Sequence, residues 1–199
     1  MEKTSLRKEF WLDGRVLFIS TMFVIYTVAA CLSLSLWSPV ALVAGVVLFF
    51  CAEYFIHRYL LHPAAIKLMP SAIKGHDKHH DDPTNMKFLL TPNTYNVPYH
   101  GFLWIALILI WGNFYLASSM MVGFSAYHLM YEWTHFVSHR PIVPRTLLGR
   151  WMKKVHLLHH FKDPDQWYGV THPVFDKVMH TDKLDLPKAD QSKDKHASM

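Results

Sequence analysis

The sequence predicts an all-α integral membrane protein with about four transmembrane helices, arranged in two hairpins beneath a helical, histidine-rich cap. Three observations support this fold class. Two long stretches of the chain contain no charged residue, all lysines and arginines lie outside them, and the chain contains 15 histidines, most of them in four short motifs. Its 199 residues are enough for one domain, so we expect a single domain over 1–199.

The first uncharged stretch predicts a helical hairpin. Residues 16–37 contain no charged side chain and exceed the roughly 20 helical residues that cross a bilayer core. Pro39 interrupts this run and residues 39–56 resume it, so we expect one helix over 16–37 and a second over 39–56. A secretory signal is the alternative for the first run, but the run is long for a signal and no small-residue cleavage site follows.

The second uncharged stretch, residues 101–131, predicts another hairpin. Gly112 and Asn113 interrupt it near the middle. The stretch is too short for two full spans unless flanking residues are recruited, so we place this hairpin at 97–134. The C-terminal residues 183–199 are polar, and we expect them to form a flexible tail.

The basic residues predict the orientation in the membrane. All 20 lysines and arginines lie in three segments, 3–15, 58–87 and 140–195. Because such loops resist translocation, these segments and both termini are expected on the cytoplasmic side of a bacterial inner membrane or of the endoplasmic reticulum. Residues 57–90 and 135–182 then form the cytoplasmic cap. This orientation explains the net charge of +5 without nucleic acid as a partner.

Ten histidines in the cap segments predict a dinuclear metal site. The motifs HRYLLH, HDKHH, HFVSH and HLLHH contain His57, His62, His76, His79, His80, His135, His139, His156, His159 and His160. Residues three and four apart share a helix face, so we expect each HxxHH triplet to point to one position. The five-residue spacing in HRYLLH requires a helix end or a distortion. Crowded imidazoles repel when protonated and need partners when neutral, and a metal such as iron, copper or zinc meets both demands.

Six further side chains are candidates for orienting these histidines by hydrogen bonds. They lie in or near the motifs and are Glu53, Asp77, His128, Glu132, Asp163 and Asp176. For each acid, a surface or helix-end charge is an equal alternative. His128 lies on nearly the same helical face as His135 and His139, but deeper in the membrane segment. His100, His172 and His180 are weaker candidates.

The order of the motifs adds a resemblance to a known family. HRYLLH, HDKHH, YEWTHFVSH and HLLHH, closed by WYGVTHPVFDKVMHT, extend from Glu53 to Thr181. This series resembles the fatty acid hydroxylase/sterol desaturase superfamily of integral-membrane di-iron enzymes, and is most similar to the catalytic domain of fatty acid 2-hydroxylases. The resemblance implies that the ten motif histidines bind two iron ions, which zinc can replace in purified protein. His128, His172 and His180 do not match ligand positions of the family.

The resemblance also implies a reaction. A di-iron oxygenase would hydroxylate an unactivated C–H bond of a lipid from the bilayer, with a fatty acyl chain as substrate, C2 as position and O2 as cosubstrate. Because only 15 residues precede the first apolar run, we expect no fused haem domain and a separate electron donor, either cytochrome b-type or a ferredoxin-type reductase system.

Two alternatives stay open at this point. Within the superfamily, the reaction could be sterol or carotenoid hydroxylation, or desaturation. In a different class, the chain could be a membrane protein that handles zinc or copper without catalysis. Transport would call for ligands along a path inside the membrane, whereas these motifs lie on one face.

Overall fold

The computed structural model describes residues 3–62 and 69–183, and this part of the chain is helical without a β-strand. The prediction of an all-α fold is therefore confirmed. Four long helices run side by side: α2 (Gly14–Cys31), α3 (Ser38–Ile56), α6 (Asn93–Trp111) and α7 (Phe114–Ser138). The predicted tail, apart from Lys183, lies outside the described residues, and so do residues 63–68 of the predicted cap.

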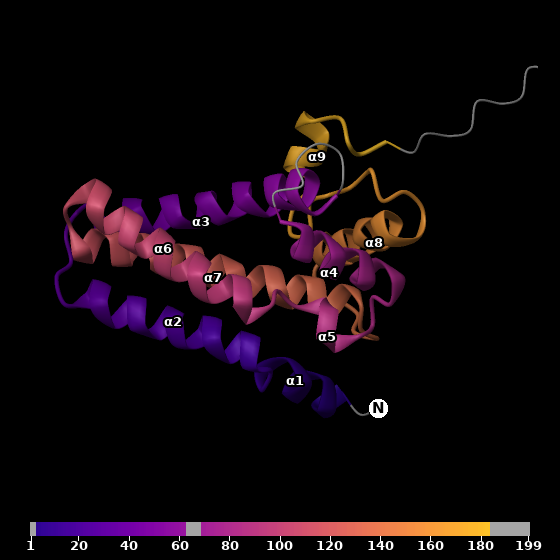
Figure 1. The fold of residues 1–199 in the computed structure, drawn as a ribbon, viewed down its shortest axis with the longest axis horizontal. Coiled ribbons are helices and arrows are strands. Elements are labelled where there is room, and N and C mark those ends of the chain that lie inside the picture. The colour runs from indigo at the N-terminus through magenta and orange to yellow at the C-terminus, as the bar shows by residue number, and fades with distance from the viewer. Residues whose placement is uncertain (1–2, 63–68, 184–199) are drawn as a thin grey trace, which may run out of the picture.

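The short elements gather at one end of this bundle (Figure 1). They are α1 (Lys3–Trp11), the π-helical segment η1 (His57–Leu61), α4 (Pro70–Asp81), α5 (Met86–Leu89), α8 (Leu147–Phe161) and α9 (Val174–Val178). The turns that join α2 to α3 and α6 to α7 lie at the opposite end. This arrangement places all four histidine motifs at the same end of the bundle.

The helix predicted over 16–37 ends earlier, at Cys31. The following residues are uncharged but form a turn, in which the backbone N–H of Ser35 donates to the hydroxyl of Ser38 at 3.0 Å. Leu36 in this turn is 96% exposed. The prediction from hydropathy extended the helix through this turn. Hydropathy depends on side-chain composition alone and does not detect the serine hydrogen bonds that reverse the chain.

The second hairpin turns where the sequence analysis placed the interruption. Gly112 ends α6 in the left-handed conformation, with φ of 60°, and the Asn113 side chain accepts the N–H of Leu116 at 2.9 Å to begin α7. Both helices extend beyond 97–134 and thereby recruit flanking residues.

Two helices of the described chain are long and apolar enough to cross a membrane, Gly14–Cys31 and the continuous segment Ser38–Leu61. The longer segment joins α3 to η1 without a break. Four transmembrane helices therefore remain a prediction.

Two glycines bring the backbones of α3 and α7 into close contact. A Cβ atom added to Gly45 would lie 1.9 Å from the carbonyl oxygen of Met120, and one added to Gly123 would lie 1.9 Å from that of Leu42. Small residues at such crossings allow helices to pack closely in an apolar environment. Because α3 continues into HRYLLH and α7 ends in HFVSH, this contact fixes the distance between two histidine motifs.

Candidate metal centre

All ten motif histidines meet in two clusters at the end of the bundle. In each cluster, one ring nitrogen from every histidine lies within 4.8 Å of the others. The first cluster consists of His57, His62, His76, His80 and His159. The second cluster consists of His79, His135, His139, His156 and His160. The described residues therefore offer two sites with five imidazoles each.

The prediction that each HxxHH triplet points to one position is wrong. Helix α4 contributes His76 and His80 to the first cluster but His79 to the second. Helix α8 shows the opposite division: His156 and His160 belong to the second cluster and His159 belongs to the first. Adjacent residues on a helix are rotated by about 100°, so the two histidines that end each motif diverge toward different clusters.

The five-residue spacing of His57 and His62 is accommodated by a π-helical turn. The N–H of His62 donates to the carbonyl oxygen of His57 at 3.2 Å, which is the i to i+5 hydrogen bond of a π-helix. Their Nε2 atoms then lie 3.3 Å apart. The sequence called for a helix end or a distortion, and this π-helical turn at the end of α3 provides it. The pair has its counterpart in His135 and His139 at the end of α7.

The donor set fits a metal ion in each cluster. The Nε2 atom of His76 lies 2.9–3.2 Å from the Nε2 atoms of three other histidines. One ring nitrogen has a single proton or lone pair and cannot satisfy three hydrogen bonds, whereas nitrogens about 2.0–2.1 Å from a shared ion lie at similar separations. In the second cluster, both ring nitrogens of His79 and of His160 are buried without a hydrogen-bond partner among the described residues.

The two clusters adjoin one another, and burial disfavours the protonation of their histidines. The rings of His80 and His160, from different clusters, stack with centroids 4.1 Å apart. Burial and then neighbouring imidazoles lower the pKa of His156 and His159 well below 6.5, and that of His139 to about 2. Neutral imidazole is the form that binds metals, so these sites are prepared for ligation at neutral pH.

Acid should destabilise the metal-free protein. Because the folded state lowers these pKa values, the unfolded chain binds more protons, so stability is full above about pH 6.5 and falls as the pH drops below it. We expect the thermal unfolding midpoint of metal-free protein in detergent to decrease steadily from pH 7 to pH 5. A variant with leucine at His79 and His160 should show a shallower decrease, and equal slopes would contradict this prediction.

Two histidines of the first cluster are held by backbone carbonyls. Nδ1 of His57 donates to the carbonyl oxygen of Tyr168 at 2.6 Å, and Nδ1 of His159 donates to that of Gln166 at 2.7 Å. Such bonds fix the ring orientation and leave Nε2 as the ligand atom. These partners could not be predicted from the sequence, because a backbone carbonyl has no side-chain pattern. The closing motif WYGVTHPVFDKVMHT, which contains Tyr168, gave an indirect indication of them.

Glu53 and Asp176 are buried but contact the backbone around the cluster instead of its rings. Glu53 Oε1 accepts both the N–H and the hydroxyl of Thr171, at 3.2 and 2.7 Å. Asp176 accepts the N–H groups of Tyr168 and Gly169, at 2.8 and 2.9 Å. Within the described residues, no hydrogen bond joins any of the five predicted acids to the ten histidines.

Among the described residues, neither Asp77 nor Asp163 forms a hydrogen bond with a ring nitrogen of the clusters. Asp77 is exposed on α4. Asp163 closes a local turn by accepting the N–H of Asp165 at 3.0 Å. For these two acids, the structure shows the alternative of a surface or turn residue.

His128 and Glu132 belong to a separate buried polar group. Nε2 of His128 lies 3.4 Å from Oε1 of Glu132, which also accepts the N–H of Thr91 at 3.1 Å. Nδ1 of His128 lies 3.1 Å from Nε2 of His100. His100, a weak candidate from the sequence, is thus buried beside His128, and neither belongs to a metal cluster.

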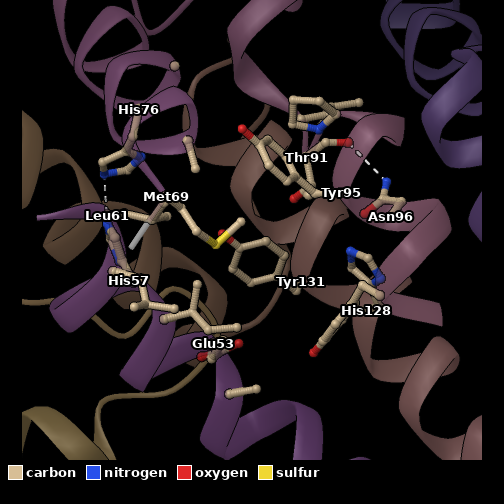
Figure 2. Close-up of a pocket in the computed structure, with 18 of the residues that line it drawn as sticks. Glu53, His57, Leu61, Met69, His76, Thr91, Tyr95, Asn96, His128 and Tyr131 are labelled. Carbon is tan, nitrogen blue, oxygen red and sulfur yellow. Dashed lines mark hydrogen bonds between the residues drawn. The ribbon is translucent and has the colours of Figure 1, made fainter. Parts of the chain in front are cut away.

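An apolar cavity of about 580 Å³ borders both clusters. Its wall includes His57 and His76 of the first cluster and His79 and His135 of the second. Figure 2 shows the lining residues Met69 and Tyr131 between His57 and His76 on one side and His128 and Asn96 on the other. Most other lining side chains are apolar, among them Phe49, Ile56, Leu60, Phe88, Leu90 and Leu103. Phe102 also lines the cavity and is 74% exposed on α6, so the cavity extends to the outer face of the bundle.

The fold and the site define a class of all-helical proteins in which two histidine clusters border an apolar cavity. The sequence model of the family described as fatty acid hydroxylase matches residues 42–181. The chain belongs to the fatty acid hydroxylase family, and the resemblance seen in its motifs is confirmed.

Individual relatives agree with this family. The chain is 29% identical over 145 residues to dihydroceramide fatty acyl 2-hydroxylase FAH2 of Arabidopsis thaliana, covering 69% of this chain and 58% of the relative. It is 28% identical over 146 residues to ceramide very long chain fatty acid hydroxylase SCS7 of Saccharomyces cerevisiae, covering 69% and 36%. The chain therefore spans little more than half of the plant relative and about a third of the yeast relative.

A solved structure has the same fold. The structure of full-length Scs7p, in which only the hydroxylase domain is visible, matches with a TM-score of 0.74 and 25% sequence identity. The match covers 89% of this chain and 68% of that chain.

Proposed function

We propose that this chain is a membrane hydroxylase that replaces a C–H bond of a fatty acyl chain by C–OH, with C2 as the position. The observation that supports this most directly is the apolar cavity, whose wall contains histidines of both clusters. A long hydrocarbon fits such a cavity, and only its C–H bonds would face the clusters. The relatives named as fatty acyl 2-hydroxylase and ceramide hydroxylases support the substrate class.

In this proposal each cluster holds one iron ion. Two bound iron ions would supply the activation of dioxygen, with two electrons from a separate donor protein of the cytochrome b or ferredoxin-reductase type. Ten imidazoles also accept zinc, so purified protein can contain zinc in the same sites. The protein contributes nitrogen ligands of fixed orientation from η1, α4, α7 and α8.

The remaining side chains position the substrate. Apolar residues of the cavity exclude water and restrict the acyl chain, so that one methylene lies next to the clusters. Tyr131 stands between the cluster side of the cavity and His128 in Figure 2, and limits how the chain bends there. The carbonyls of Tyr168 and Gln166 keep two ligand rings in one orientation.

We propose that the bundle crosses the bilayer with the clusters at the cytoplasmic side. Support comes from the two candidate spans, from the absence of basic residues in both hairpin turns and from the position of all histidine motifs at the opposite end (Figure 1). The exposed Phe102 on α6 marks where the cavity meets the surrounding lipid, so that an acyl chain enters directly from the bilayer.

The proposal can be tested by lipid analysis. The protein is expressed with a compatible reductase, a long-chain fatty acid or a ceramide-type lipid is supplied, and products are identified by mass spectrometry. We expect a hydroxylated acyl product that depends on O2. If His79→Ala and His159→Ala form as much product as the wild type, catalysis at the clusters is contradicted. Ring-hydroxylated or newly unsaturated products would favour the other superfamily reactions.

Filling the cavity should change which chains are accepted. Ala72 lines the cavity on α4, one turn before His76. The variant Ala72→Phe should lower product from the longest acyl chains by about 10- to 200-fold while shorter chains are less affected, since small volume changes in apolar pockets have effects of this size. Ala126→Phe on the exposed face of α7 is the matched control. An unchanged chain-length profile in Ala72→Phe would place the substrate elsewhere.

A further inference from the structure

Residues 166–181 form a segment, here called the closing segment, that hydrogen-bonds to one cluster only. The carbonyls of Gln166 and Tyr168 accept the Nδ1 protons of His159 and His57, and both histidines belong to the first cluster. Among the described residues, no hydrogen bond joins this segment to the second cluster. Nδ1 of His156, in the second cluster, is buried and has no hydrogen-bond partner among the described residues.

Asp176 holds the closing segment in shape. Its Oδ1 accepts the N–H of Tyr168 at 2.8 Å and the hydroxyl of Thr181 at 2.9 Å, while its Oδ2 accepts the N–H of Gly169 at 2.9 Å. A Cβ atom added to Gly169 would lie 2.7 Å from Oδ2, so only glycine allows this approach. Asp176 is 1% exposed, and its bonds fix the peptide group that contains the Tyr168 carbonyl together with the peptide group before it.

Glu53 ties the same segment to α3. Its Oε1 accepts two hydrogen bonds from Thr171, and the hydroxyl of Tyr54 lies 2.8 Å from that of Thr181. Glu53 is 6% exposed and lies one helical turn before His57. The segment is therefore anchored to the helix that presents the first cluster.

We propose that Asp176 and Glu53 are positioning residues for the first cluster, and that the closing segment makes the two metal sites inequivalent. An ion in the first cluster depends on the segment, whereas an ion in the second does not. The inference rests on the proposed function, in which each cluster binds one ion. Carbonyl acceptors orient ligand rings and raise their basicity, and loss of such partners typically lowers metal affinity by about 10- to 100-fold.

The test uses cobalt as a spectroscopic probe of metal binding. Full-length metal-free protein in detergent is titrated with Co²⁺, and bound ions are counted from the visible absorbance and by metal analysis. Asparagine at position 176 replaces one acceptor oxygen with a donor, so Asp176→Asn loses at least one backbone bond. We expect two tight sites in the wild type and in the control Asp165→Asn, whose side chain is exposed. Asp176→Asn should keep one tight site and bind the second ion about 10- to 100-fold more weakly.

Ligand variants identify which site is weakened. In the Asp176→Asn background, His139→Ala should remove the remaining tight site and His62→Ala should leave it. Glu53 gives an independent pair, because the amide oxygen in Glu53→Gln can still accept both bonds from Thr171, whereas Glu53→Ala cannot. Glu53→Ala should therefore weaken one site and Glu53→Gln should not. This pair decides the question if Asp176→Asn does not fold by circular dichroism.

Two results would overturn the inference while leaving the proposed function intact. One is two tight sites in folded Asp176→Asn and in Glu53→Ala. The other is equal weakening of both sites, which would indicate general loosening of the fold. A wild-type protein that binds no cobalt would contradict the proposed metal sites themselves and is recognised in the first titration.

Discussion

Replacing His79 with alanine is expected to lower hydroxylated product by more than about 100-fold. His79 is 1% exposed, and its ring centroid lies 4.7–4.8 Å from the ring centroids of His135, His139 and His160. Removing it leaves the second cluster one ligand short. Changes to residues that merely support ligands already cost about 10- to 100-fold, so loss of a ligand should cost at least as much.

The measurement is product formation in the reductase-coupled lipid assay, together with metal content. Lys74→Ala is the matched control, because Lys74 is exposed on the same helix, α4, and belongs to neither cluster. Activity of His79→Ala close to that of this control would argue against the second cluster as part of the catalytic centre.

Replacing Gly45 or Gly123 with alanine is expected to destabilise the bundle. Each new methyl group would lie 1.9 Å from a backbone carbonyl of the facing helix, so α3 and α7 must separate. Overpacking of this kind costs about 1–3 kcal/mol, which corresponds to a fall of about 2–12 °C in the unfolding midpoint for a chain of this size. The double variant should be less stable than either single variant.

Gly101 provides the control for this experiment. A Cβ atom added to Gly101 on α6 meets no atom within 4 Å. Alanine has a higher helix propensity than glycine by about 1 kcal/mol, so Gly101→Ala should be neutral or stabilising. Thermal unfolding of the wild type and the four variants in the same detergent is the measurement. Equal stability of Gly45→Ala and Gly101→Ala would mean that α3 and α7 do not pack as described.

The positions of the hairpins could be predicted from the sequence, but the ends of the helices could not. Uncharged stretches located both hairpins, and Gly112 with Asn113 located the second turn. The end of α2 at Cys31 depends on the hydrogen bond between Ser35 and Ser38, which composition does not reveal. The close crossing at Gly45 was also missed, because a glycine in an apolar helix gives no indication of which helix it faces.

The histidine motifs predicted a metal centre. How the ten histidines divide between two clusters depends on the three-dimensional arrangement of the helices and could not be predicted. Spacing predicted that His57 and His62 need a helix end or a distorted turn, and the π-helix supplies the distorted turn. Spacing could not show that α4 and α8 lie where each can divide its histidines between two clusters. The predicted contacts of Glu53 and Asp176 with ligand rings also differ from the observed ones. Glu53 accepts from Thr171, which is distant in sequence, and Asp176 accepts from backbone groups within its own segment.

In the proposed function, two iron ions occupy the two histidine clusters and react with dioxygen. The most direct test reconstitutes metal-free protein with ferrous iron under anaerobic conditions, counts bound iron per chain and then follows its oxidation by O2. We predict two iron ions in the wild type and one in each of His62→Ala and His139→Ala, with rapid oxidation in the wild type alone. A single exchangeable metal in the wild type, without any response to dioxygen, would contradict the claim.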